Sequence, residues 1–391
     1  MRIAFLCGSQ EAGRDGVGDY TSGLADEFRQ QGHEVIVIGL RDKFVSEVTS
    51  TERHVAGGSI QVLRLPSALP WPECIKQARL LLDRFDPDWV SLQFVCYTFH
   101  PKGLVHGLAG KLAPLLTKRK LHLMFHELWI GDNIGAAMKE ALVGRLQRAL
   151  ILRVVRKLQP SAVSTSNGTY LAMLKENGIT AFHLPLFGSI PIVQKPGHEW
   201  FFSHAATAGL SVTTENRPDF WIFGFFAALY PGWPTEPLFT VLREAANACH
   251  KRVIIASIGR IGGGSEHLWE DLVRIYGGHF GFLRLGEQPS QRVSAFLQWI
   301  DCGIATSPWT LIGKSASVSA MLEHGLPVIA NRDDWHWRGG TAPKIDPDPL
   351  LYKLDGTLKA KLGAGLRNRE PSSILPQVAR ILIEHLSLVP A

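Results

Sequence analysis

Short apolar runs alternate with amphipathic stretches along the first half of the chain. The runs have the length of strands and are Ile3–Cys7, Val35–Gly39, Ile60–Leu65, Trp89–Phe94, Leu121–Phe125 and Ala162–Thr165. The stretches between them have helical periodicity and are Tyr20–Gln31, Pro72–Phe85, Gly103–Leu116 and Gly135–Leu158. Continuously apolar strands that alternate with helices are typical of a doubly wound parallel sheet. The pattern therefore predicts an α/β domain.

The alternation stops between Leu184 and Pro218, a stretch rich in proline and glycine, and then starts again. The second set of predicted strands is Trp221–Phe226, Val253–Ile258, Phe280–Leu285, Gly303–Thr306 and Val328–Ala330. The second set of predicted helices is Thr235–Cys249, Glu266–Tyr276, Pro289–Trp299, Lys314–His324 and Ile374–Leu386. We therefore expect two Rossmann-like domains, with ligands bound outside the carboxyl ends of their strands.

Composition excludes several classes of protein. A chain of 391 residues exceeds the roughly 250–300 residues of a single core, and its 46% hydrophobic content excludes a disordered protein. No apolar run reaches the roughly 18–20 residues of a membrane span, and Ile3–Cys7 is too short for the core of a signal peptide. The five cysteines are scattered without a C-x-x-C pair, which argues against a zinc site or a disulfide framework and favours the cytoplasm. The net charge of +6 suits an anionic ligand or an anionic membrane surface.

A glycine-rich loop follows the first predicted strand. Gly16 and Gly18 lie at the start of a predicted helix, where bare backbone lets an anion approach the amides, and Asp19 follows them. These three residues are therefore candidate binding residues. A dinucleotide fingerprint would need glycine where Thr21 stands, which excludes NAD binding by this loop. The alternative is a plain turn in which Asp19 caps the helix.

The strand Leu121–Phe125 is followed by His126 and Glu127. A histidine at the carboxyl end of a strand can donate a hydrogen bond to a sugar hydroxyl or to a developing charge, and Glu127 can orient it. Ile130 stands where an H-E-x-x-H motif would need its second histidine, which excludes that zinc chemistry. The alternative is a histidine with a structural role in a loop.

The sharpest local feature of the second half is Gly313, Lys314 and Ser315 at the start of a predicted helix. Amides, a hydroxyl and an ammonium group converge there at the positive end of the helix dipole, which indicates a phosphate site. Pro308 excludes a Walker A loop and Ser317 excludes a G-x-S-x-G elbow. Ordinary N-capping by Ser315 is the alternative.

Two other strand ends of the second half carry candidate ligand contacts. Arg260, next to several glycines, can hold a diphosphate, although a surface loop is the alternative. Gly286 and Glu287 follow another strand and can pass backbone against a flat base. We interpret Asp86-Pro87-Asp88 and Asp346-Pro347-Asp348 as turns and not as metal sites.

One predicted helix, Gly135–Leu158, has a basic face. Its basic residues fall within about half of a helical wheel, and they are Arg145, Arg148, Arg153, Arg156 and Lys157. Such a face can lie on anionic lipid, which would make this a protein peripheral to the inner membrane face. The alternative is a solvated face over a packed core.

Several of these segments together resemble a known family. They are the strand within Met1–Cys7, the loop Gly16–Tyr20, the segments Gly32–Val35 and Leu184–Phe187, and Gly313–Ile329, which ends in His-Gly-Leu-Pro-Val-Ile. In these features the chain resembles the GT-B glycosyltransferases, and in particular the nucleotide-sugar-dependent enzymes of family 4. The resemblance covers most of the chain.

The resemblance implies two Rossmann-like domains that face a central cleft. Residues 1–195 would bind the acceptor, residues 196–371 the nucleotide sugar, and a helix in 372–391 would pack back on the N-terminal domain. The reaction implied is metal-independent transfer, with retention, of a sugar from a nucleotide diphosphate sugar to a hydroxyl acceptor, with no cofactor and no nucleic acid partner. The catalytic residues would be His126, Lys314 and Asp19, and the substrate-binding residues Gly16, Gly18, Glu127, Arg260, Gly286, Glu287, Gly313 and Ser315.

The chain also departs from the family pattern. The paired glutamates of family 4 would fall at Ile312 and Ala320, and neither residue is acidic. The usual carboxylate contacts to the donor sugar and ribose are therefore absent. For this reason two alternatives stay open beside a glycosyltransferase: a nucleotide-sugar epimerase on the same fold, and a non-catalytic GT-B binding protein.

Overall fold

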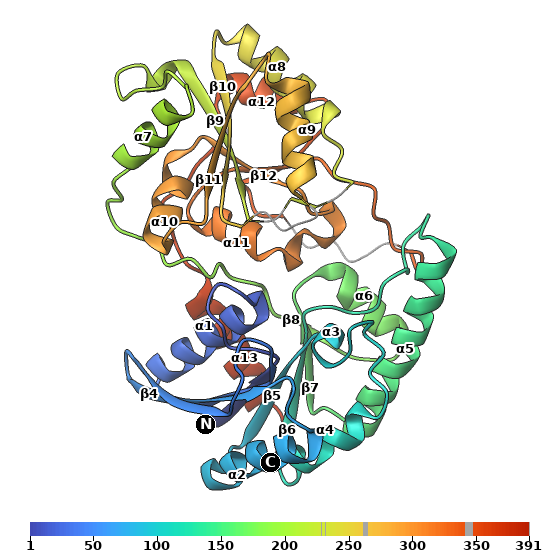
Figure 1. The fold of residues 1–391 in the computed structure, drawn as a ribbon. Helices are drawn as coiled ribbons and strands as arrows, with labels where there is room; N and C mark the ends of the chain where they lie inside the picture. The colour runs from blue at the N-terminus through green and yellow to red at the C-terminus, as the bar shows by residue number, and fades with distance from the viewer. Residues whose placement is uncertain (228, 231, 261–264, 341–346, 391) are drawn as a thin grey trace. The chain divides into compact units, whose positions relative to one another are not determined.

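The computed structural model describes residues 1–227, 229–230, 232–260, 265–340 and 347–390 (Figure 1). The chain forms two compact units. Unit 1 comprises Met1–Ser189, His336–Lys344 and Leu375–Ala391, and unit 2 comprises Ile190–Trp335 and Ile345–Ile374. The glycines at 262–264 and Asp346, which entered the sequence predictions, lie outside the described residues.

Unit 1 is built on a sheet with the strand order β3-β4-β2-β1-β5-β6-β7-β8. The strands are β1 (Arg2–Cys7), β2 (Glu34–Asp42), β3 (Thr49–Val55), β4 (Gly58–Pro66), β5 (Trp89–Phe94), β6 (Lys120–Phe125), β7 (Ala162–Thr165) and β8 (Phe182–His183). Their pairing is parallel except that β3 runs antiparallel to β4. Strand β3 was not predicted, because this edge strand is polar and largely exposed and has no apolar run.

The helices of unit 1 lie beside this sheet (Figure 1). They are α1 (Gly16–Gln30), α2 (Trp71–Phe85), α3 (Cys96–Phe99), α4 (Leu108–Leu116), α5 (Met138–Leu158), α6 (Gly168–Glu176) and α13 (Leu375–Ser387). Helix α13 returns to unit 1 from the far end of the chain, where Gln31 donates to the Pro376 carbonyl and His385 stacks on Phe182 at 3.9 Å between ring centroids. This is the return of the last helix that the resemblance implied.

Unit 2 has a parallel sheet with the order β11-β10-β9-β12-β13-β14. Its strands are β9 (Phe220–Phe226), β10 (Arg252–Ile258), β11 (Gly281–Gly286), β12 (Cys302–Ala305), β13 (Val328–Ala330) and β14 (Leu351–Lys353). Its helices are α7 (Glu199–Thr207), α8 (Glu236–Ala248), α9 (Glu266–Tyr276), α10 (Ser290–Trp299), α11 (Ala316–Glu323) and α12 (Leu358–Ala364), with 3-10 turns η1 (Arg217–Asp219) and η2 (Trp309–Lys314). Helix α7 lies in the stretch predicted to be irregular.

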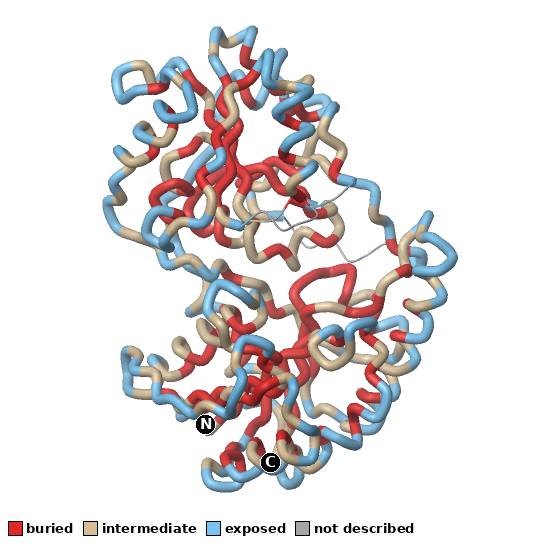
Figure 2. The backbone as a smooth tube through the Cα atoms, viewed as in Figure 1, coloured by how far each residue is buried: buried red, intermediate tan, exposed pale blue. Residues whose placement is uncertain are grey.

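The central strands of both sheets are almost completely buried (Figure 2). In unit 2, apolar side chains cover both faces of the sheet and form two clusters, one around Phe201 and Phe296 and one around Phe223 and Phe239. Burial on both faces explains why the strands are continuously apolar in sequence. The α/β class and the pair of Rossmann-like units are therefore confirmed.

Candidate functional site

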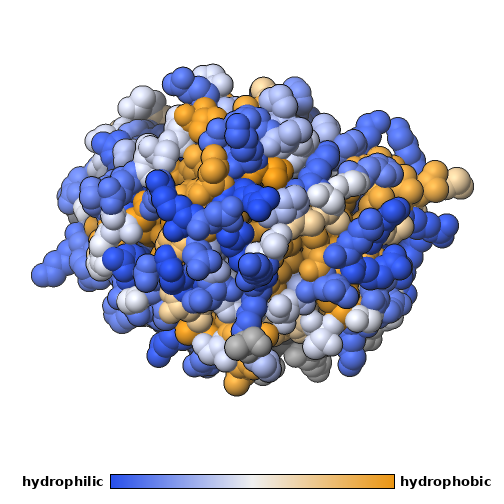
Figure 3. Space-filling view, turned by 90° about the horizontal axis from the view of Figure 1, so that it is seen from below, coloured by the Kyte–Doolittle hydropathy of each residue, from blue (hydrophilic) through white to orange (hydrophobic). Residues whose placement is uncertain are grey.

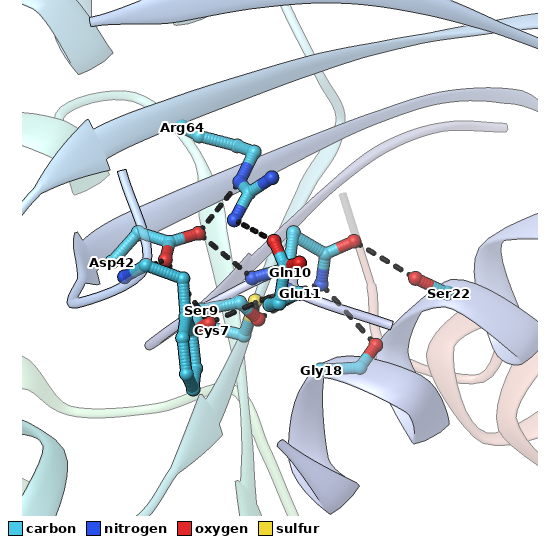
Figure 4. Close-up of polar contacts among 9 residues, drawn as sticks. Cys7, Ser9, Gln10, Glu11, Gly18, Ser22, Asp42 and Arg64 are labelled. Carbon is cyan, nitrogen blue, oxygen red and sulfur yellow. Dashed lines mark hydrogen bonds and ion pairs between the residues drawn. The ribbon is translucent and has the colours of Figure 1, made fainter. Parts of the chain in front are cut away.

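The loop after β1 is fixed by a polar network at the carboxyl ends of β1, β2 and β4 (Figure 4). The Gln10 side chain accepts from Ser22 Oγ at 2.8 Å and donates to the Gly18 carbonyl at 3.2 Å, so it ties the loop to α1. Arg64 donates to Asp42 at 2.8 Å and to Glu11 at 2.7 Å. The network joins the loop to α1 and to the ends of β2 and β4.

Asp42 is the centre of this network. Its carboxylate is completely buried and accepts from Ser9 Oγ and from the backbone N–H groups of Gln10 and Phe44, in addition to Arg64. Burial acts to raise the pKa of Asp42, but the hydrogen bonds from Arg64 and the two amides outweigh it and hold the pKa below its ordinary value. Asp42 is therefore a buried anion. It was not among the predicted site residues.

The start of α1 differs from the prediction. Asp15 is the N-cap, and its carboxylate accepts from the N–H groups of Val17 and Gly18 at 3.0 and 3.1 Å. A Cβ on Gly18 would come within 2.4 Å of the Ser9 carbonyl oxygen, so this glycine permits close packing of the helix on the loop. The amide of Gly18 was predicted to receive an anion, and it is instead occupied by a side-chain carboxylate. Gly16 has open space where a Cβ would lie.

Asp19 lies in the first turn of α1 and accepts from the N–H of Gly13 at 2.9 Å. Burial raises the pKa of Asp19, the nearby charge of Asp15 adds to this, and the hydrogen bond from Gly13 opposes it. The alternative interpretation, in which Asp19 caps α1, is therefore wrong, because Asp15 is the cap. Two carboxylates at one helix start repel a diphosphate, so we expect this edge of unit 1 to meet an uncharged group.

His126 follows β6 and is 7% exposed. Its Nε2 lies 2.9 Å from Oε1 of Gln93, and its ring meets the edge of Tyr20 at 5.0 Å between centroids. Burial lowers the pKa of His126 to about 3, so the ring is neutral near pH 7. A neutral imidazole can donate and accept hydrogen bonds but does not supply a positive charge. Glu127, the next residue, is partly buried.

In unit 2, three neighbouring strands end in residues with left-handed backbone. Ala227 after β9, Gly259 after β10 and Gly286 at the end of β11 have φ of +67°, +94° and +66°. Left-handed backbone at a non-glycine residue such as Ala227 costs about 1–3 kcal/mol and concentrates at functional sites. At Gly286 the space that a Cβ would occupy is open, with no atom within 4 Å. The sequence showed the glycines but gave no signal for Ala227.

Two predicted binding residues of unit 2 contact each other. Arg260 donates to both carboxylate oxygens of Glu287, at 2.8 and 3.0 Å, and so joins the ends of β10 and β11. Both side chains are exposed. A diphosphate that binds Arg260 would compete with this carboxylate.

The predicted phosphate site lies in a turn of helix that follows β12. Gly313 and Lys314 end η2, and α11 begins only at Ala316. Ser315 is the N-cap of α11: its Oγ accepts from the N–H of Val318 at 3.4 Å and lies 3.1 Å from the Ser317 hydroxyl. The N-capping alternative is therefore confirmed for Ser315. Lys314 precedes the positive end of α11 and is partly buried.

The basic face predicted on α5 is reduced by one residue. Arg148 donates to Asn177 at 2.9 Å and lies over the ring of Trp129, so it belongs to the packing of unit 1. The other four basic residues, Arg145, Arg153, Arg156 and Lys157, are exposed. Exposed apolar side chains that were not predicted lie in the first half of α5 and just before it: Ile134, Met138, Leu142 and Leu146.

A cavity of about 710 Å³ lies in unit 2 at the amino ends of β9 and β12, where Trp221, Asp301 and Cys302 are among its lining residues. This is the edge of the sheet opposite to Gly259 and Gly286. Arg217 pairs with Asp301 there at 2.8 Å. The cavity therefore contains none of the predicted site residues.

Three further properties concern metal ions, the membrane and disulfides. Among the described residues, no three His, Cys, Asp or Glu side chains are grouped so that they could hold one metal ion. No helix in the described ranges is both long enough and apolar enough to cross a membrane. All five cysteines are described, and none of them forms a disulfide.

The two units together define a GT-B fold, and comparison with solved structures supports this class. Similar structures include HepE of Anabaena in complex with UDP and glucose, which is 12% identical, covers 99% of each chain and has a TM-score of 0.55. Another is the catalytic domain of starch synthase IV from Arabidopsis thaliana bound to ADP and acarbose. It is 12% identical, the match covers 98% of each chain, and the TM-score is 0.53.

A third similar structure is a putative UDP-N-acetylglucosamine 2-epimerase from Listeria monocytogenes. It is 13% identical, the match covers 100% of this chain and 97% of that one, and the TM-score is 0.51. No protein-family model matches the chain, and no curated protein matches it in sequence. At this identity the likeness shows the fold, and membership of family 4 stays a prediction.

Proposed function

We propose that the chain is a glycosyltransferase that moves a sugar from a nucleotide diphosphate sugar to a hydroxyl acceptor. The observation that carries the proposal is the carboxyl edge of the sheet in unit 2. Lys314 and the start of α11 follow β12. The three other strands β9, β10 and β11 each end in a residue with left-handed backbone. A cation next to the start of a helix suits a diphosphate.

The predicted residues other than Gly18 have a place in this proposal. Lys314, with Gly313 and Ser315, would hold the leaving diphosphate, and Gly286 would lie against the base. Arg260 would exchange Glu287 for phosphate. The structures of similar fold support the substrate class, because one was solved with UDP and glucose and another with ADP and acarbose.

On unit 1, His126 would contact a sugar hydroxyl as a neutral ring, beside Glu127. Asp19 and Gly16 would line the acceptor side of the site. Transfer with retention and without a metal, and a cytoplasmic location, stay predictions from the sequence.

A nucleotide-sugar epimerase is the second candidate. The absence of acidic residues at Ile312 and Ala320 counts against family 4 chemistry. A putative epimerase is among the proteins of similar fold, which makes epimerisation the second reaction to test. The two reactions differ in one respect: an epimerase changes its sugar without an acceptor.

A thermal-shift panel with UDP-, ADP-, GDP- and dTDP-sugars tests the shared part of both candidates. We expect the sugars of one nucleotide base to raise the melting temperature by at least about 2–4 °C at saturating ligand, because a ligand that binds only the native state stabilises it. Incubation with that donor, with and without a hydroxyl acceptor, then separates them. Nucleoside diphosphate released only with acceptor indicates transfer, and an isomerised donor without acceptor indicates epimerisation. A chain that no nucleotide sugar stabilises would contradict the proposal.

For the partner of α5, we propose an anionic membrane surface. Met138, Leu142 and Leu146 follow one another at intervals of four residues, so they share one face of the helix, and Met138 is 90% exposed. Exposed basic residues continue this face, and Glu140 is an acidic residue in the first turn. Figure 3 shows hydrophobic residues gathered at the right-hand edge, on the side where α5 lies in Figure 1. Apolar side chains followed by cations suit a lipid interface.

Vesicle sedimentation tests this surface. We expect the chain to bind vesicles that contain phosphatidylglycerol more tightly than vesicles of phosphatidylcholine alone, because each basic residue near the surface adds about 1 kcal/mol. The double variant Leu142→Glu, Leu146→Glu should lower binding by more than about tenfold. The matched control is Leu80→Glu on α2, which changes a leucine on another helix whose exposure of 60% lies between 68% for Leu142 and 48% for Leu146, and it should have no effect. Equal binding to both vesicles would contradict the proposal.

A further inference from the structure

A row of buried polar side chains runs across the sheet of unit 1 and ends at His126. Gln93 Nε2 donates to Ser91 Oγ at 2.8 Å, and Ser91 Oγ lies 2.8 Å from His122 Nδ1. On the other side of this imidazole, Nε2 lies 2.8 Å from Ser164 Oγ. The side chains lie on one face of β5, β6 and β7, where Ser91 pairs with His122. We call these residues, with His126 and Met124, the polar row.

The inner end of the polar row sets its direction. Ser164 Oγ lies 2.9 Å from the Sδ atom of Met124, and a thioether can only accept a hydrogen bond. Because Ser164 gives its one hydrogen to sulfur, it accepts from Nε2 of His122. A neutral His122 with a proton on Nε2 has a bare Nδ1, which must then accept from the hydroxyl of Ser91.

The outer half of the row follows from this direction. Ser91 has given its hydrogen to His122, so it accepts from the amide nitrogen of Gln93. The Gln93 oxygen then points to His126 and accepts from its Nε2. Burial lowers the pKa of both His122 and His126 to about 3, so neither ring takes a second proton near pH 7. Among the described residues, Nδ1 of His126 has no partner.

We propose that the polar row fixes the neutral Nε2–H tautomer of His126, so that its Nδ1 meets the substrate as a hydrogen-bond acceptor. Gln93 and His122 are then positioning residues, which act through His126 and do not touch the substrate. The group that binds Nδ1 must donate a hydrogen bond. A sugar hydroxyl satisfies this condition, whereas an ionised phosphate or carboxylate oxygen does not. The choice of a sugar hydroxyl rests on the proposed function, but the tautomer does not.

NMR of the full chain, labelled with ¹⁵N in histidine, tests the tautomer without any ligand. Comparison with His126→Gln assigns the ring signals of His126. We expect one protonated nitrogen, Nε2, and an unprotonated Nδ1 throughout pH 5–8. A proton on Nδ1, or a charged ring in this range, would overturn the proposal.

Two variants test the row itself. Met124→Leu keeps the apolar volume but removes the terminal acceptor, so the Ser164 hydroxyl can turn to His122 and both tautomers of His126 should appear. Gln93→Met removes the acceptor next to His126 and should lower kcat/KM for the donor and acceptor pair by about five- to tenfold. The control is Met173→Leu, which changes a buried methionine of α6 outside the row. It should change neither the tautomer of His126 nor kcat/KM. A wild-type tautomer in both Met124→Leu and Gln93→Met would show that the row does not fix it.

Discussion

Substitution of Lys314 by alanine should lower kcat/KM by about 10²–10³-fold. The expected loss is that of a charged group that stabilises a developing negative charge, here on the departing diphosphate. The binding of the nucleotide sugar should weaken less than turnover falls, because the charge on the leaving group grows in the transition state. The measurement is the initial rate of nucleoside diphosphate release with the donor that the thermal-shift panel identifies.

Two further variants make the Lys314 result specific. Lys314→Arg keeps a cation at the start of α11 and should recover part of the lost rate. Lys359→Ala removes another lysine of unit 2, which pairs with Glu244 on the surface, and should leave the rate unchanged. An unchanged kcat/KM in Lys314→Ala, with wild-type thermal stability, would remove Lys314 from the site.

The sequence predicted the elements that are buried on both faces. Strand β5, Trp89–Phe94, and strand β7, Ala162–Thr165, lie where their largely apolar runs place them, because a strand in the middle of a parallel sheet is buried on both faces. Strand β3 and helix α7 were missed. The first is a polar edge strand, and the second lies between prolines in a stretch that shows no periodicity.

The candidate site was less predictable than the fold. Position after a strand was enough to single out His126, Arg260 and Lys314, since parallel strands end at one edge of a sheet. Hydrogen-bond partners depend on side chains from distant elements, and no local pattern reveals them. For this reason the sequence did not show that Arg260 meets Glu287, or that Asp15 occupies the amide of Gly18.

One signal in the sequence was available and was not used. Ser91, Gln93, His122 and Ser164 are polar residues within otherwise apolar strands. A polar residue in a strand buried on both faces needs a partner, so several of them in neighbouring strands predict a hydrogen-bonded network. Such a network would have been a second reason to single out His126, in addition to its position after a strand.

Substitution of Asp42 by alanine should lower the free energy of unfolding of unit 1 by about 3–5 kcal/mol, which is a large part of the total for an ordinary domain. The buried carboxylate satisfies Arg64, Ser9 and the N–H groups of Gln10 and Phe44 together. Its loss leaves these donors without their acceptor, and Ser9 among them is buried. Urea titration with hydrogen exchange resolved by peptide measures the change, and peptides from β9 and β10 in unit 2 serve as an internal reference.

The same carboxylate should make wild-type unit 1 sensitive to acid. The pKa of Asp42 is lower in the folded chain than in the unfolded chain, so its stabilisation is complete above the unfolded value of about 4. The stabilisation is lost as the pH falls through the folded pKa, and Asp42→Asn should lack this part of the pH dependence. The matched control is Glu34→Ala at the other end of β2, an exposed partner of Arg2, which should cost at most about 1 kcal/mol. If Asp42→Ala and Glu34→Ala have equal effects, the buried network does not stabilise the loop after β1.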